Sequence, residues 1–160
     1  MAYPEAAALS QVSEFHRLFR HPVREEPGLP DSNRCQLRVN LLQEELRELQ
    51  EALEQGNLVE AADALCDLQY VLSGAIHEFG LGSVFAELFA EVHRSNMSKA
   101  CRSLAEAEAT VAHYKNNHNT ECDFEQVGEL YLVYRRSDRK TLKSVAYSPA
   151  DLASRLPKQG

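Results

Sequence analysis

Residues 42–67, LQEELRELQEALEQGNLVEAADALCD, hold two helical patterns joined by a single short turn. Leucine recurs through the first half at spacings of three and four residues, which is typical of one face of an α-helix. Gly56 can end this helix, and Asn57 can cap a second helix that runs to about Phe79. Because almost no chain separates the two helices, we expect an antiparallel hairpin. The apolar row of its first helix is Leu42, Leu46, Leu49 and Leu53.

The same stretch carries the whole charge imbalance of the chain. It contains eight acids against one base, Arg47, whereas the rest of the 160 residues hold 16 acids and 16 bases. The net charge of −7 therefore has a local origin. An acidic surface of this kind repels the phosphates of nucleic acids, so we expect no nucleic-acid partner.

Outside this stretch, the sequence predicts a mainly α fold, an antiparallel bundle of four to five helices with a small C-terminal β-hairpin. Two β-rich runs, residues 129–134 and 141–146, flank the turn-like segment 137–140 and predict the hairpin. A last short helix is expected to start at Ser148. The predicted helices cover residues 9–19, 31–56, 57–79, a segment that begins at 83, and 104–114.

We divide the chain into a helical domain, residues 1–120, and a C-terminal segment, residues 121–160. Two strands alone are only marginally stable in water. We therefore expect the hairpin to pack on the same domain or on a partner subunit.

Several features predict a cytoplasmic protein that contacts no membrane. The longest run poor in charge, residues 68–76, is too short to span a bilayer, and the N-terminus lacks the basic start of a signal peptide. The four cysteines show neither a CxxC pair nor the spacing of zinc ligands, which favours free thiols.

The second helix of the hairpin has an unusual charge pattern. Residues 58–76 are apolar on nearly every side, and the only charged residues are Glu60, Asp63 and Asp67. At 100° per residue these three lie within an arc of about 60°. We expect a helix of this composition to be buried, so that its acidic stripe faces protein.

The first helix supplies matching acids. Glu45 and Glu48 lie one turn apart beside the leucine row, so the hairpin can bring them towards Glu60 and Asp63. Four carboxylates form an oxygen-only site that suits a hard divalent cation, Mg²⁺ with Mn²⁺ as a substitute. In the alternative interpretation, Glu60 only completes a helix cap and the other glutamates only solvate a helix face.

Together, Glu44-Glu45-Leu46-Arg47-Glu48 and Glu60-Ala61-Ala62-Asp63 resemble the EExxE and ExxD signature of the all-α nucleoside triphosphate pyrophosphohydrolases. That superfamily includes MazG-like enzymes, dimeric all-α dUTPases and phosphoribosyl-ATP pyrophosphohydrolase. Residues 62–68 and 91–99 resemble the MazG-like branch. The resemblance covers about residues 37–100, and the C-terminal hairpin lies outside the minimal helical core of the family.

The resemblance implies a Mg²⁺-dependent hydrolase acting on acid anhydrides. It converts a nucleoside triphosphate and water to the monophosphate and diphosphate, for nucleotide pool control or housecleaning. Glu44 would position or deprotonate the attacking water, and Asp67 would hold a further metal ion or one of its waters. The implied metal ligands are Glu45, Glu48, Glu60 and Asp63.

The fourth helix offers candidate substrate residues. Asn96 falls four residues after Val92 on the apolar row, and Lys99 follows three residues later, so both can face one pocket. An ammonium group there would meet a phosphate, and an amide would meet a base or sugar. Arg94 lies off that row and is a weaker candidate. In the alternative, Asn96 and Lys99 only finish the helix.

Two aromatic residues of the first helix, Phe15 and His16, are further candidates, because both can stack on a nucleobase. The alternative is that they belong to the core. The basic residues at positions 135–143 are expected to form a solvated strand edge.

Two further expectations concern assembly and activity. A two-helix hairpin leaves much apolar surface uncovered, so we expect a homodimer or a tetramer built from two dimers. The competing functions are phosphoribosyl-ATP hydrolysis and a non-enzymatic helical interaction module.

Overall fold

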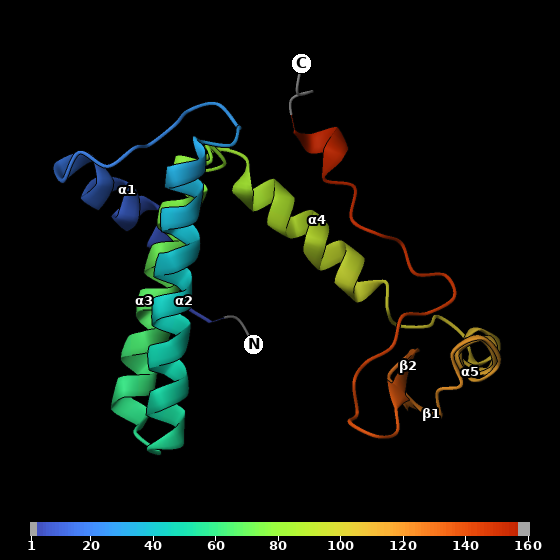
Figure 1. The fold of residues 1–160 in the computed structure, drawn as a ribbon. Coiled ribbons are helices and arrows are strands. Elements are labelled where there is room, and N and C mark those ends of the chain that lie inside the picture. Colours follow the sequence, from blue (N-terminus) through green and yellow to red (C-terminus); the bar gives the residue numbers. More distant parts are fainter. Residues whose placement is uncertain (1–2, 157–160) are drawn as a thin grey trace. The chain divides into compact units, whose positions relative to one another are not determined.

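The computed structural model describes residues 3–156, which form a mainly α protein with a small antiparallel sheet (Figure 1). The fold class expected from the sequence is confirmed. In the described part of the chain, no helix is long and apolar enough to cross a membrane. The elements are α1 (Ala8–Leu18), α2 (Ser32–Glu54), α3 (Leu58–Glu78), α4 (Phe85–Met97), α5 (Leu104–His118), β1 (Cys122–Val127), β2 (Leu130–Arg135) and the 3₁₀ turn η1 (Ala153–Arg155).

The chain folds as two compact units, which we describe separately. The first unit runs to Phe85 and also includes Leu156, and the second unit is Ala86–Arg155. The division of the chain at residue 120 stays a prediction.

In the first unit, α2 and α3 form the predicted hairpin. The side chain of Asp31 accepts hydrogen bonds from two N–H groups at the start of α2, and Asn57 does the same for α3. Gly56 has a φ of +65°, a left-handed conformation that favours glycine and lets the chain turn directly from one helix into the next. The predicted cap at Asn57 and the predicted helix end at Gly56 are therefore confirmed.

The expectation that α3 is buried on every side is wrong. Ala61 and Ala64 are buried, as is the run from Ser73 to Glu78, but Leu58 and Leu65 on another face are largely exposed. Glu60, Asp63 and Asp67 of α3 are exposed as well. The physical reason is that within this unit α3 contacts only α2 and α1, and two neighbours cannot enclose a helix.

A buried ion network joins α2 to α3 at the end of the hairpin farthest from the bend at Gly56. Glu78 is fully buried, and its carboxylate accepts hydrogen bonds from Arg34 and Arg38 of α2. Burial raises the pKa of Glu78, but the bonds from Arg38 and Arg34 outweigh this effect and lower the pKa below its ordinary value.

His16 of α1 completes this network. Its Nδ1 lies 2.9 Å from the Pro22 carbonyl oxygen, and its Nε2 lies 3.5 Å from Nη2 of Arg38. Gly74 of α3 is needed at this point, because a Cβ there would come within 2.9 Å of the His16 ring and 2.7 Å of the Arg38 guanidinium. The network thus fixes α1 against both helices of the hairpin.

The second unit has a small core of its own between α5 and the sheet. Cys101 and Thr141 pair with residues of β2 through isolated bridges, which fasten the flanking chain to the hairpin. The buried core residues are Cys101, Ala107, Cys122, Val133 and Leu142.

The predicted strand pairing is wrong. Residues 129–134 correspond to β2, but the partner of β2 is the preceding segment β1, paired from Val127↔Leu130 to Cys122↔Arg135. Gly128, with a φ of +61°, permits the two-residue turn between them. Residues 141–146 meet β2 only at their start, through the bridge between Thr141 and Tyr134 and the bond from the Leu142 N–H to the Val133 carbonyl. The weak strand propensity of β1 hid this pairing.

The last helix also differs from the prediction. It is a three-residue 3₁₀ turn that begins at Ala153 rather than at Ser148. Asp151 accepts a hydrogen bond from the N–H of Ser154, so this acid forms the cap, three residues after the expected cap Ser148.

We predict that Glu78→Gln lowers the free energy of unfolding by about 3–5 kcal/mol, because the change leaves two guanidinium groups without their anion in a buried place. Urea denaturation at neutral pH measures the loss. Glu51→Gln is the matched control, since Glu51 is exposed and lies 3.7 Å from an equally exposed Arg47. The control should change stability by less than about 0.5 kcal/mol, and equal effects of the two changes would contradict the prediction.

Candidate metal centre

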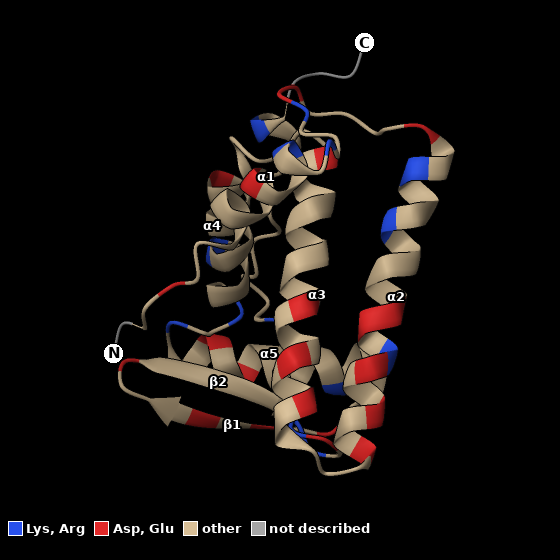
Figure 2. Cartoon of the chain, turned by 90° about the vertical axis from the view of Figure 1, so that its left-hand side faces the viewer, with Lys and Arg blue, Asp and Glu red and all other residues tan. Residues whose placement is uncertain are grey.

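Glu45 lies at the centre of the acidic half of the hairpin. Its side chain is half-buried, and its Oε2 atom is buried without a hydrogen-bond partner in the part of the chain that the structure describes. Figure 2 shows the acids of α2 and α3 side by side in the half of the hairpin nearest the bend. Two basic residues near the start of α2 lie at the other end.

The electrostatics of Glu45 identify its neighbours. Burial raises the pKa of this carboxyl, and the charges of Asp67, Glu48, Glu44 and Asp63 raise it further, in that order. The structure thus brings together acids from both helices, as expected. Asp67 has the largest charge effect on Glu45, although the sequence suggested it only as an additional ligand.

Glu60 is placed differently from the other predicted ligands. It is exposed in the first turn of α3, and it is not among the acids that raise the pKa of Glu45. Its backbone N–H donates to the Asn57 side chain at the helix cap. Antiparallel helices that pair Glu45 with Asp67 place Glu60 one to two turns nearer the bend.

The donor set fits a hard divalent cation. The nearby acids supply only oxygen, which Mg²⁺ prefers, and one of these oxygens has no partner. The only base of this stretch, Arg47, is largely exposed and lies 3.7 Å from Glu51. Within residues 3–156, no group of three or more His, Cys, Asp or Glu side chains already has the geometry of a metal cage.

The aromatic candidates of α1 have separate environments. Phe15 contacts Phe19, with ring centroids 4.4 Å apart, and meets Tyr70 edge-on at 5.5 Å. His16 is buried, and both of its ring nitrogens are engaged, so in this structure it serves the contact between α1 and the hairpin.

Tyr70 is a candidate that sequence reasoning missed. It lies on α3 three residues after Asp67, on the same side of the helix as the acidic stripe, and it is partly exposed. Its helical spacing from Asp67 was the available signal. The contact with Phe15 could not be read from spacing, because it joins two distant helices.

The candidates on α4 belong to the second unit. Lys99 Nζ donates to Asn96 Oδ1 at 2.7 Å, so these two side chains do lie together. Arg94 instead makes a bidentate ion pair with Glu91, which raises the pKa of the Arg94 guanidinium further above its ordinary value.

A comparison with known families agrees with this geometry. The family model of phosphoribosyl-ATP pyrophosphohydrolase matches residues 12–96, more than half of the chain. The chain belongs to the phosphoribosyl-ATP pyrophosphohydrolase family. The resemblance to this superfamily is thereby confirmed, and it supports a hydrolase that acts on pyrophosphate bonds. The match contains every acid of the candidate metal centre and ends before α5.

The chain is also similar to a curated protein. It is the uncharacterized protein L479 of Acanthamoeba polyphaga mimivirus, which is 25% identical. The similarity covers 88% of this chain and 92% of the relative, so it extends beyond the family match.

We predict that Glu45→Gln raises the melting temperature of the metal-free protein by a few degrees at neutral pH. A raised carboxyl pKa means that folding disfavours the charged form, so stability is lost as the pH rises through that pKa, and a neutral amide removes this loss. Millimolar Mg²⁺ should stabilise the unmodified protein but not the variant. Thermal denaturation with EDTA or Mg²⁺ measures both effects.

Glu51→Gln, on the same helix but with a largely exposed side chain, is the control and should keep the response to Mg²⁺. A variant at Glu45 that is less stable without metal, or equally stabilised by Mg²⁺, would contradict the prediction.

Proposed function

We propose that this protein is a Mg²⁺-dependent nucleoside triphosphate pyrophosphohydrolase that converts a (d)NTP and water to the (d)NMP and diphosphate. The observation that carries the proposal is the unpartnered carboxylate oxygen of Glu45 among acids of both helices. Family membership supports hydrolysis of a pyrophosphate bond.

The residues that would hold the metal are the five predicted ligands of the hairpin. When bound, Mg²⁺ would polarise phosphate oxygens and offset their negative charge, which explains why acids line a site for an anionic substrate. These ligands are Glu45, Glu48, Glu60, Asp63 and Asp67.

Glu44 is the proposed general base. It is exposed beside Glu45, so a water molecule can reach its carboxylate. Glu44 would accept a proton from the water that attacks phosphorus, and the phosphoanhydride bond would break to give the (d)NMP and diphosphate.

Aromatic side chains supply a surface for the nucleobase. In the first unit Phe15 contacts both Phe19 and Tyr70, and Phe19 and Tyr70 are partly exposed. Tyr70 lies one turn from Asp67, so a base stacked there would be close to the carboxylates. Asn96 and Lys99 remain the proposed partners of the sugar, base or phosphates.

A second candidate substrate is phosphoribosyl-ATP, which the description of the matching family names. It carries the same type of pyrophosphate bond, so the same acids would serve. An assay with this compound beside the nucleoside triphosphates distinguishes the two substrates.

We predict that the protein, with Mg²⁺, converts members of a panel of canonical and modified triphosphates to monophosphate and diphosphate. Glu48→Gln and Asp63→Asn should each reduce kcat by more than about 100-fold, because each change removes a charged metal ligand. ³¹P NMR identifies the products, and circular dichroism verifies the fold. Glu54→Gln, outside the acidic cluster on α2, should retain activity.

No turnover on the panel together with turnover of phosphoribosyl-ATP would establish the second substrate. No turnover of any of these compounds would refute the enzymatic proposal.

We also propose that the protein is a homodimer, or a tetramer of two dimers, assembled through the hairpin. Leu53 of α2 and Leu65 of α3 are 65% and 55% exposed. Leucines repeat at seven-residue spacing on both helices, and on α3 they lie opposite the acidic stripe. An exposed apolar face of this kind is typical of a subunit interface. The exposed leucines of this face are Leu46, Leu53, Leu58, Leu65 and Leu72.

We predict that the double change Leu53→Glu and Leu65→Glu converts the assembly to a monomer, because a carboxylate in an apolar interface lacks a partner. Sedimentation velocity measures the mass. Leu29→Glu, an equally exposed leucine in the connector before α2, is the control and should not change the mass. A monomeric unmodified protein would contradict the prediction.

A further inference from the structure

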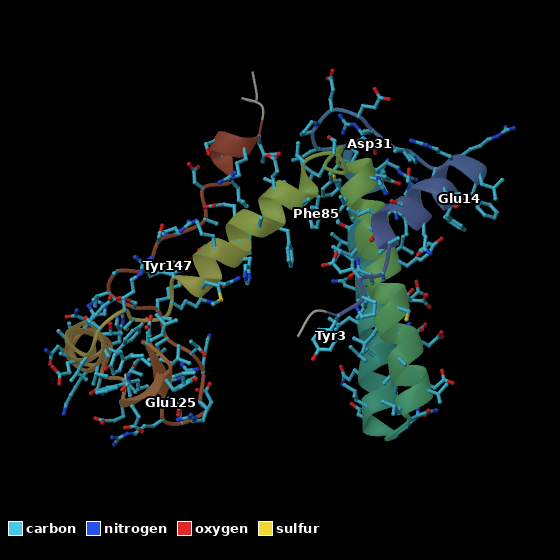
Figure 3. All side chains as sticks on the ribbon, turned by 180° about the vertical axis from the view of Figure 1, so that it is seen from behind. Tyr3, Glu14, Asp31, Phe85, Glu125 and Tyr147 are labelled. Carbon is cyan, nitrogen blue, oxygen red and sulfur yellow. The ribbon has the colours of Figure 1, made fainter. Side chains whose placement is uncertain are left out.

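In the second unit, the chain after the sheet returns to α4. We call residues 144–155 the C-terminal strap. Figure 3 shows Tyr147 of the strap beside the C-terminal end of α4. Its phenolic oxygen lies 2.9 Å from Oγ of Ser95, a buried residue of that helix.

Glu91 of α4 is the main attachment point of the strap. Its side chain is 5% exposed, although it carries a charge. The carboxylate accepts a hydrogen bond from the Asp151 N–H at 2.9 Å and one from Arg155 Nη2 at 3.1 Å, both in the strap. Arg94 adds a bidentate pair from the helix itself, at 2.9 and 2.8 Å.

These donors keep Glu91 ionised. The bonds from Arg94 and from the Asp151 N–H lower the pKa of Glu91 to about 2. At neutral pH the carboxylate is therefore a permanent acceptor for the strap. Charge-assisted and bidentate bonds are among the stronger hydrogen bonds in proteins.

The last turn of α4 is held by additional bonds. Arg94 also donates to Oγ of Ser148 and to the Pro149 carbonyl, at 3.1 and 3.0 Å. The Ser148 N–H donates to Ser98 Oγ at 3.0 Å. Arg94, a predicted substrate residue, thus has most of its donors committed to Glu91 and the strap.

The strap leaves another side of α4 open. At 100° per residue, Glu91, Ser95 and Ser98 share one side, whereas Asn96 lies about 140° from Glu91. The Ser144 N–H donates to the Lys99 carbonyl at 3.2 Å, just beyond the end of the helix. The strap therefore holds the backbone of Asn96 and Lys99 from the side of α4 that carries Glu91.

The Asn96 side chain is exposed and pairs with Lys99. Its oxygen accepts the bond from Lys99, which leaves its amide N–H groups and the remaining ammonium N–H groups of Lys99 as donors. Neighbouring donors of this kind suit an anionic acceptor such as a phosphate.

We propose that Glu91 is a positioning residue which, through Arg94 and Arg155, fastens the C-terminal strap to α4 and so orients Asn96 and Lys99 to bind the phosphates of the substrate. This inference rests on the proposed function. It assigns a role to residues 144–155, which lie outside the segment that the family model matches.

The test uses the full chain with millimolar Mg²⁺ and two non-hydrolysable probes, the α,β-imido analogues of dUTP and dATP. Calorimetry gives Kd for each probe, and steady-state assays give kcat and KM. The variants are Glu91→Gln, Arg155→Ala and Arg155→Lys. Arg136→Ala is the control, because Arg136 makes an exposed ion pair with Asp123 in the same unit.

We expect Glu91→Gln and Arg155→Ala to raise Kd and KM about tenfold, a loss of about 1.4 kcal/mol in binding, with kcat within about twofold. Arg155→Lys should restore most of the affinity, and Arg136→Ala should change nothing. Hydrogen exchange should become faster in residues 144–155 of the affected variants. Because the Arg155 side chain is partly exposed, its variants remain informative if Glu91→Gln does not fold.

The possible results separate this proposal from the proposed function. Faster exchange in the strap with unchanged Kd and KM would overturn the positioning role and leave hydrolysis intact. Probe binding that depends on Arg155, in a protein that hydrolyses no triphosphate, would support positioning and overturn the proposed activity. A wild-type chain that binds neither probe would overturn both.

Discussion

The carboxylate of Glu45 lies between two helices with one oxygen buried and without a partner, and the nearest charges are all negative. At the opposite end of the same hairpin, the carboxylate of Glu78 is more deeply buried, but it accepts hydrogen bonds from Arg34 and Arg38. Among the described residues, the Glu78 carboxylate thus has two cationic partners, whereas the buried oxygen of Glu45 has no hydrogen-bond partner. This difference between the two ends of the hairpin underlies the proposed metal site at Glu45.

The ion network around Glu78 also influences the acidic half of the hairpin, through α1. The buried ion network fixes α1 through His16, and α1 in turn brings Phe15 against Tyr70 of α3. Aromatic surface therefore lies one turn from Asp67 without any contribution from the second unit. A carboxylate cluster with an aromatic neighbour is suited to a substrate that combines phosphates with a base.

The second unit is stabilised by its own core and its own ion pairs. Its core is small and lies between α5 and the sheet, and its arginines pair mostly with acids of the same hairpin. The exception is the buried carboxylate of Glu91, where helix and strap meet. The family match ends at residue 96, so it includes nearly all of α4 but neither α5 nor the sheet.

The sequence by itself determined the helices of the hairpin, their caps and the acidic stripe, because caps and helical spacing depend on residues a few positions apart. Only the tertiary structure decided that β1 pairs with β2, that Asp67 and Asp63 rather than Glu60 raise the pKa of Glu45, and that α3 exposes an apolar face. The roles of His16 and Arg94 were decided in the same way. Each of these facts depends on which distant surface a side chain meets, and local spacing carries no information about that surface.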